Sequence, residues 1–224
     1  MKNRGFLVAL LLLFLLTAAS FRAAASDGGL VSFKDGFVPP ATEGLSLILS
    51  EHGVYLAEDE ALLEPYRAWI DVLEPNERVP VTLEEPSEEV PAVRGGAKAV
   101  ASAWQWTMIG FQSFWDAETY GNDVRVAVID SGCSAHTDLT DNILPGKNYF
   151  DGSTDVTDDI GHGTHISGII AAQLNDIGIN GAAPKAKIVP LKCFRNGESP
   201  TNAMLIEAID DAVNVYGCRV INMS

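Results

Sequence analysis

The sequence predicts an α/β fold, in which a parallel, doubly wound sheet over residues 101–224 follows a small α+β domain. Three apolar strand patterns, at 123–130, 185–194 and 218–224, alternate with helical patterns, as is typical of a parallel sheet. These strands are almost continuously apolar, which indicates that both of their faces are covered. Residues 26–83 show shorter strand patterns instead, so a separate, smaller domain is expected there.

The first domain is predicted from four segments within residues 26–83. "GGLVSFKDGF" favours a short strand, and "SLILSEHGVYLA" favours a strand, a turn at its glycine and a second strand. "EDEALLEPYRAWI" places Leu62, Tyr66 and Trp69 on one helical face, although its proline weakens a helix. "ERVPVTLEE" predicts a final edge strand. Residues 84–100 follow with acids, prolines and paired glycines but no periodicity, which predicts a linker.

The second domain is predicted to begin near residue 101. "DVRVAVID" and "KAKIVPLKCF" are buried strands, and Pro190 is unusual in the second of them. "HGTHISGIIAAQL" turns helical after its first residues. "SPTNAMLIEAIDDAVNVYG" predicts a helix that Ser199 caps, with Pro200 in its first turn and Gly217 at its end. "CRVINMS" predicts a third buried strand. The apolar stripe expected on the helix comprises Met204, Leu205, Ala208, Ile209, Ala212 and Val213.

The charge balance excludes one broad class of partner. The chain has 30 acidic and 15 basic residues, a formal net charge of −15. Nucleic-acid binders depend on lysine and arginine to neutralise phosphates, so no nucleic-acid partner is expected.

The first residues predict secretion. Lys2 and Arg4 precede an apolar run from Phe6 to Leu16, and small residues follow at 23–25. This arrangement is typical of a secretory signal peptide, predicted over residues 1–25. The apolar run is shorter than the roughly 20 residues that a membrane span needs. An uncleaved N-terminal anchor is the alternative. If the signal peptide is cleaved, no stable association of the remaining chain with the membrane is expected.

The chain has three cysteines, Cys133, Cys193 and Cys218. A sparse, odd set is no disulfide framework. One bridge is possible in an oxidising compartment, and burial as small apolar side chains is expected for at least two of the three.

Two residues stand where catalytic side chains gather in α/β folds. Asp130 ends a predicted parallel strand and precedes a glycine turn, and such strand ends form the ligand edge of an open sheet. His162 starts a predicted helix between two glycines. The helix N-terminus disfavours an imidazolium there, and a buried carboxylate would offset that effect and select the tautomer. A histidine held by an aspartate is a common way to activate a serine hydroxyl. A strand-end aspartate that only caps a turn is the alternative.

A metal site is the competing interpretation of His162 and His165. Zinc helices usually place histidines four residues apart with a glutamate between them. Here the spacing is three residues and the residues between are Gly163 and Thr164. We therefore expect His165 to be a hydrogen-bonded packing residue within the helix.

The motifs "VAVIDSG" and "GHGTHISGIIAA" resemble the aspartate and histidine motifs of the subtilisin-like serine proteases. "QWTMIGFQSFWD", "NDIGINGAAPKAKIVPLKCF" and "VINMS" resemble further segments of that family, so the resemblance covers about residues 103–224. It implies a subtilisin-type sheet, a secreted serine endopeptidase that acts on polypeptides, Asp130 as the triad aspartate and His162 as the base. Residues 26–83 are similar in position and size to the family's propeptide, which acts as an intramolecular chaperone and inhibitor until it is cleaved.

The resemblance also implies a structural calcium site and a substrate-binding edge. Oxygen atoms of carboxylates, amides and backbone carbonyls are suitable Ca²⁺ ligands. A plain loop without calcium is the alternative. The implied calcium ligands are Asp138, Asn175 and the carbonyls of Gln173, Ile177 and Ile179. The implied substrate residues are Glu198, Ser199, Pro200 and Ser224.

The family's nucleophile has no counterpart in these 224 residues. The sequence contains neither Gly-Thr-Ser nor Gly-x-Ser-x-Gly, and it stops at Ser224 within a predicted strand. We expect an N-terminal fragment of a protease that lacks the serine and the oxyanion asparagine, and that is inactive alone. A truncated, non-catalytic binding protein and a small metal-binding protein remain alternatives.

Overall fold

The computed structural model describes residues 28–34, 37–49, 53–79, 106, 108–175 and 178–224. The described residues fall into two compact units. One lies within Met1–Val79 and Thr201–Glu207, and the other within Pro80–Pro200 and Ala208–Ser224. In these ranges no helix has both the length and the hydropathy that crossing a membrane requires. The predicted signal peptide and linker lie outside the described residues and stay predictions.

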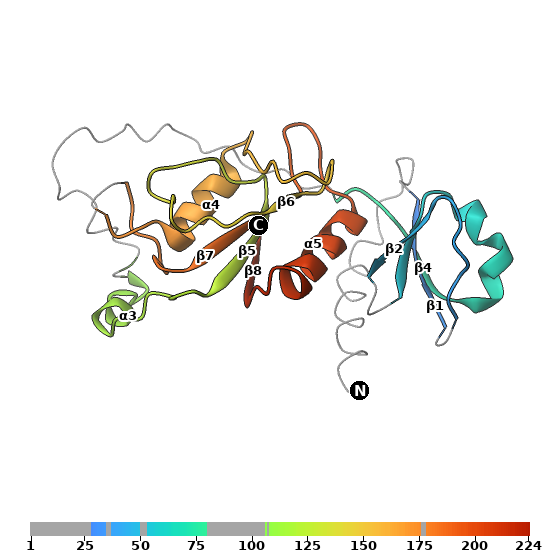
Figure 1. The fold of residues 1–224 in the computed structure, drawn as a ribbon, viewed down its shortest axis with the longest axis horizontal. Helices are drawn as coiled ribbons and strands as arrows, with labels where there is room; N and C mark the ends of the chain where they lie inside the picture. Colours follow the sequence, from blue (N-terminus) through green and yellow to red (C-terminus); the bar gives the residue numbers. More distant parts are fainter. Residues whose placement is uncertain (1–27, 35–36, 50–52, 80–105, 107, 176–177) are drawn as a thin grey trace. The chain divides into compact units, whose positions relative to one another are not determined.

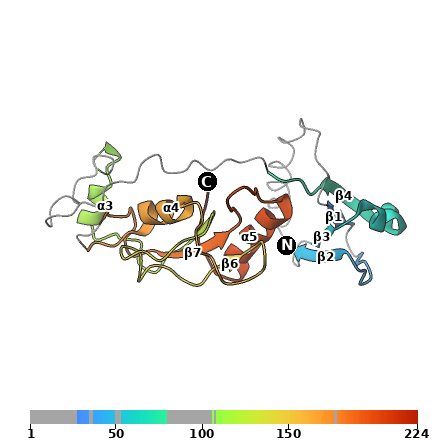
Figure 2. The same cartoon turned by 90° about the horizontal axis from the view of Figure 1, so that it is seen from above.

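The N-terminal unit, seen in Figure 1, is a four-stranded antiparallel sheet; its strand order, β2-β3-β1-β4, can be followed in Figure 2. The strands are β1 (Gly29–Phe33), β2 (Leu45–Leu49), β3 (Val54–Ala57) and β4 (Ile70–Pro75), with a 3₁₀ helix, η1 (Glu60–Trp69), between β3 and β4 in the sequence.

Both faces of this sheet carry buried side chains. Alternate residues of a strand point to opposite faces, and both Leu30 and Val31 of β1 are buried. Val31 packs with Leu63 of η1. Leu30 packs on the other face with Ala203 and Ile206, which belong to the first turns of helix α5 (Asn202–Asn214). The N-terminal sheet therefore shares its second core with a segment that lies far along the chain.

Two expectations for this unit are corrected. The fourth strand is Ile70–Pro75, whereas the predicted strand at 77–85 has only an isolated bridge at Arg78, and its residues from 80 on are outside the described ranges. The predicted helix is a 3₁₀ helix. Leu63 is its buried residue because it packs against Val31 of β1, and Trp69 is 52% exposed.

The second unit contains a parallel sheet with the order β6-β7-β5-β8, which confirms the predicted α/β class. Its elements can be followed in Figures 1 and 2. They are α3 (Gln112–Asp116), β5 (Arg125–Asp130), β6 (Lys147–Asn148), α4 (His162–Ala171), β7 (Lys187–Lys192), the remainder of α5 and β8 (Val220–Met223).

The core of the second unit forms around β5. Val126 and Val128 are buried with Ala171 of α4, and the intervening Ala127 and Ile129 are buried on the opposite face. The chain passes from β6 through α4 to β7, and from β7 through α5 to β8 on the far side of β5. Helix α4 covers the face of the sheet on which Val126 and Val128 lie.

Local details of the second unit differ from the prediction. Helix α5 begins at Asn202, and the hydroxyl of Thr201, in place of Ser199, accepts from Met204 N at 3.3 Å. Val213 is 52% exposed, whereas Ile206 is buried. Strand β8 is partly exposed because, among the described strands, it pairs only with β5 at the edge of the sheet. The short elements α3 and β6 have no counterpart in the prediction.

All three cysteines are buried and none forms a disulfide, so the expected packing role holds for each of them. Burial raises the pKa of the Cys133 and Cys218 thiols.

Candidate active site

Asp130 is the last residue of β5 and is fully buried at the carboxyl edge of the parallel sheet. One carboxylate oxygen, Oδ1, accepts hydrogen bonds from the backbone N–H of Ser131 at 2.7 Å and from its hydroxyl at 3.2 Å. The backbone carbonyl of Asp130 accepts from Cys193 N at 2.9 Å, just beyond β7. The neighbouring residue Ser131 therefore fixes the position of the Asp130 carboxylate.

The Asp130 carboxylate also bonds to His162, the first residue of α4. Its Nδ1 lies 2.8 Å from Oδ1 and 2.9 Å from Oδ2 of Asp130, and the two residues are 32 positions apart in the sequence. An ionised carboxylate only accepts hydrogen bonds, so Nδ1 carries the proton and Nε2 has the free lone pair. The side chain of His162 is 18% exposed. This is the geometry of a general base that a buried carboxylate orients.

Glycines allow this close approach. A Cβ on Gly163 would lie 2.2 Å from the carbonyl oxygen of Gly132 and 3.1 Å from Oδ1 of Asp130. Instead, the N–H of Gly163 donates to the hydroxyl of Ser131 at 2.9 Å. Gly161, the residue before α4, has a φ of 92°, a left-handed conformation that glycine adopts without strain.

Asp158 supports the start of α4, and sequence reasoning missed it. Its carboxylate accepts from Thr164 N at 2.8 Å, from Thr164 Oγ1 at 2.6 Å and from Gly161 N at 2.8 Å. Burial raises the pKa of Asp158, but these hydrogen bonds outweigh it, and the net pKa lies below the ordinary value. The signal that could have revealed it is an aspartate one turn before a helix whose own N-cap residue is a glycine without a side chain.

His165 does not have the predicted packing role. It lies on the exposed side of α4. The helix places residues three apart on neighbouring positions, but Gly163 and Ser167 are the buried residues of this turn, so the face of His165 is turned to solvent.

The predicted calcium ligands are partly brought together. Asp138 is 2% exposed; its Oδ2 accepts from Ile179 N at 3.1 Å, whereas its Oδ1 is buried without a hydrogen-bond partner. Gln173 N donates to the backbone carbonyl of Asp138 at 2.9 Å, and Asn175 Nδ2 donates to Gln173 Oε1 at 3.3 Å. Ile177 is outside the described residues. A buried carboxylate oxygen without a partner is the atom that a cation would satisfy.

The predicted substrate residues lie beyond the ends of two strands. Glu198 closes a short turn with Arg195, whose Nε donates to its carboxylate at 2.7 Å, and Ser199 and Pro200 follow. Pro200 is buried. Ser224 follows β8, and its hydroxyl accepts from Asn222 Nδ2 at 2.8 Å.

The comparisons with known proteins agree with the site. Residues 121–224 match the family model described as the subtilase family, Peptidase S8. The thermostable alkaline protease of Halalkalibacterium halodurans is 32% identical over 168 residues, which cover 69% of this chain and 46% of that protein. The minor extracellular protease Epr of Bacillus subtilis is 36% identical, over 54% of this chain and 18% of that protein.

An intracellular serine protease of Paenibacillus polymyxa is 38% identical over 52% of this chain and 37% of that protein. The chain thus spans less than half of the length of each of these relatives. The aspartate–histidine pair joins β5 to α4, and both elements lie inside the matched segment. Residues 121–224, the C-terminal half of the chain, belong to the subtilase family.

Proposed function

We propose that this chain carries the aspartate–histidine half of a serine endopeptidase that hydrolyses peptide bonds. The observation that carries the proposal is the hydrogen bond of 2.8 Å between Nδ1 of His162 and the fully buried carboxylate of Asp130. In the reaction, Nε2 of His162 takes the proton of a serine hydroxyl as the oxygen attacks the peptide carbonyl, and later gives that proton to the leaving amine. Asp130 stabilises the imidazolium that forms between the two steps.

The nucleophile and the oxyanion donor are proposed to come from polypeptide outside these 224 residues. The sequence has no Gly-Thr-Ser, and the hydroxyl of Ser224 is engaged by Asn222. The relatives, of which the chain spans less than half, support this proposal. The 224 residues alone are accordingly expected to be inactive.

The test is hydrolysis of casein or a labelled peptide by the whole gene product. Asp130→Asn selects the wrong histidine tautomer and His162→Ala removes the base, so each is expected to lower kcat by about 10⁴-fold. Gly168→Ala, on the same helix, is the control, since its Cβ would meet only Ile179 Cδ1 at 3.8 Å. A His162→Ala protein that retains its activity, or hydrolysis by the 224 residues alone that depends on His162, would refute the assignment.

We propose that the N-terminal unit is a propeptide that assists folding and covers the site before cleavage. Asn76 Oδ1 accepts from Ala203 N at 2.9 Å, Asn202 N donates to Glu77 O at 3.0 Å, and Arg78 forms an antiparallel bridge with Thr201. These bonds satisfy backbone groups at the N-terminus of α5, which otherwise lack partners. The alignment with the alkaline protease covers 69% of the chain and so extends N-terminal of residue 121, which also supports the proposal.

A structural calcium ion is proposed beside Asp138. The unpartnered Oδ1 of Asp138 supports a cation there. Asp138 would supply a charged oxygen, and Asn175 and the backbone carbonyls of the same loop would supply neutral ones. When bound, the ion would tie the loop before α4 to the loop after it.

Secretion is proposed from the N-terminal sequence pattern, and the extracellular protease among the relatives supports it. An intracellular relative makes a direct test necessary. N-terminal sequencing of the protein from culture medium is expected to find none of residues 1–25, whether or not the proposed propeptide has also been removed; a product that keeps residues 1–25 would contradict the proposal.

The zinc-binding alternative gains no support. Nδ1 of His162 is occupied by Asp130, and His165 is exposed. Within the described ranges, no group of three histidines, cysteines or carboxylates is placed to hold a metal.

A further inference from the structure

One charged side chain next to the aspartate–histidine pair has no part in the proposed reaction. Among the residues that the structure describes, Lys192 is the only buried lysine or arginine, with 7% of its side chain exposed. It is the last residue of β7 and lies beside Asp130 in the register of the parallel sheet. A buried ammonium is strongly unfavourable unless it is paired and hydrogen-bonded, so its partners have to be specific.

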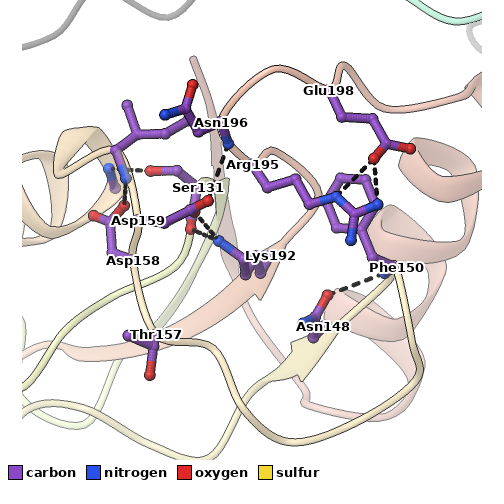
Figure 3. Close-up of polar contacts among 12 residues, drawn as sticks. Ser131, Asn148, Phe150, Thr157, Asp158, Asp159, Lys192, Arg195, Asn196 and Glu198 are labelled. Carbon is purple, nitrogen blue, oxygen red and sulfur yellow. Dashed lines mark hydrogen bonds and ion pairs between the residues drawn. The ribbon is translucent and has the colours of Figure 1, made fainter.

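These partners come from the two segments that carry the pair. Nζ of Lys192 donates to the backbone carbonyl of Ser131 at 2.6 Å and to Oδ1 of Asp159 at 2.5 Å (Figure 3). Ser131 directly follows Asp130, and Asp159 lies three residues before His162. One ammonium group therefore connects the end of β5 to the loop that leads into α4.

Asp159 is suited to hold this connection. Its Oδ2 accepts from Asn196 N at 3.0 Å, so the carboxylate is fixed from a second side. Burial raises the pKa of Asp159 and the hydrogen bond from Lys192 lowers it, with a net pKa below the ordinary value, so the group is ionised at neutral pH. Ser131 extends the connection, since its hydroxyl donates to Asp130 and accepts from Gly163 N.

We infer that Lys192 is a positioning residue, which sets the distance between Asp130 and His162 by binding Ser131 and Asp159 at once. The inference rests on the proposed function for its role in catalysis. Lys192 adds charge-assisted bonds between the loop before α4 and the end of β5, and such bonds are roughly twice as strong as neutral ones. We expect the loss of Lys192 to change the orientation of His162. Lys192 itself is not expected to contact the substrate.

The first test uses the 224-residue chain and does not depend on proteolysis. In the chain labelled with ¹⁵N-histidine, NMR measures how fast the Nδ1 proton of His162 exchanges with water, and His162→Gln assigns the signal. We expect Lys192→Met and Asp159→Asn to speed this exchange by at least about tenfold, since a misplaced carboxylate protects the proton less. Lys192→Arg, which keeps a charged donor, should restore part of the protection.

A matched control lies on the same strand. Lys187 starts β7, and its Nζ donates to Asp141 O at 2.8 Å and to Asn142 Oδ1 at 3.0 Å. It lies about 17 Å from Lys192 along the strand, from the rise per residue. Lys187→Met removes the same kinds of bond and should leave the exchange within about twofold of the unsubstituted chain, as expected for a purely structural lysine.

Two outcomes overturn the inference. One is unchanged exchange in both Lys192→Met and Asp159→Asn, and the other is equally fast exchange in Lys187→Met. If Lys192→Met does not fold, as judged by circular dichroism, Asp159→Asn and Lys192→Arg decide, because the Asp159 side chain is 45% exposed and its replacement is milder.

In the whole gene product, Lys192→Met should lower kcat by about 10- to 100-fold and leave KM within about twofold, as for a misplaced base. If the unsubstituted protein hydrolyses no peptide, the proposed function fails while the exchange measurement still tests the positioning role. If the unsubstituted protein is active and the Lys192→Met variant keeps the full kcat, the positioning role of Lys192 is refuted while the proposed function stands.

Discussion

The most direct test of the site geometry is the substitution Gly163→Ala. Gly163 is the second residue of α4, and its N–H donates to Ser131 Oγ at 2.9 Å. Alanine is the better helix former, so helix propensity alone predicts a stabilisation of about 0.8–1 kcal/mol. The surroundings predict the opposite.

The magnitude follows from two distances. The new Cβ would lie 2.2 Å from the carbonyl oxygen of Gly132, whereas a carbon–oxygen contact needs about 3.3 Å. The start of α4 and the loop at Gly132 therefore have to separate by about 1 Å. Such overpacking is destabilising by about 1–3 kcal/mol. The same shift would stretch the bond of 2.8 Å between His162 and Asp130 beyond hydrogen-bonding range.

The assay combines stability and activity. Thermal unfolding of the Gly163→Ala chain should occur at least about 4 °C lower, from 1 kcal/mol in a domain of this size. In the whole gene product, kcat should fall about 100-fold, as for a misplacement of about 1 Å. Gly168→Ala, on the same helix, is the control. Its new Cβ would meet only Ile179 Cδ1 at 3.8 Å, an ordinary contact, so this variant should keep its activity and stability. A Gly163→Ala protein as stable and active as Gly168→Ala would refute the close-approach argument.

Three further predictions concern the supports of the site. Asp158→Asn keeps an acceptor oxygen but removes its charge, and should lower stability by about 1 kcal/mol at pH 7, the difference between charged and neutral hydrogen bonds. Because the folded pKa of Asp158 is depressed, its contribution is present above the unfolded value of 3.8 and is lost as pH falls through the folded pKa, so urea titrations of the two proteins should converge in acid. Calcium at 100 times its Kd should stabilise the chain by about 2.7 kcal/mol, and Asp138→Asn should abolish this gain in a thermal shift assay. Asn76→Ala leaves the buried N–H of Ala203 without its acceptor and should lower stability by about 1–3 kcal/mol in chemical denaturation; an unchanged midpoint would contradict the capping role.

Much of the fold was predictable because its signals are local. The continuous apolar pattern of "RVAVID" predicts a parallel strand, and the structure has β5 at Arg125–Asp130. Errors arose where neighbours elsewhere decide the outcome. Trp69 was expected on a helical face with Leu62, but Leu63 packs against Val31 of the sheet instead and Trp69 is exposed.

The sequence by itself determined the three longer strands and the two longer helices of the second unit and the candidates Asp130 and His162, because periodicity, turn residues and short motifs act within a few positions. Only the tertiary structure decided which distant groups meet. It brings Nδ1 of His162 to Asp130 across 32 residues and Lys192 to Asp159 across 33. It also leaves one oxygen of Asp138 without a hydrogen-bond partner. These contacts depend on the path of the backbone and on which buried polar groups find partners, and no local pattern carries that information.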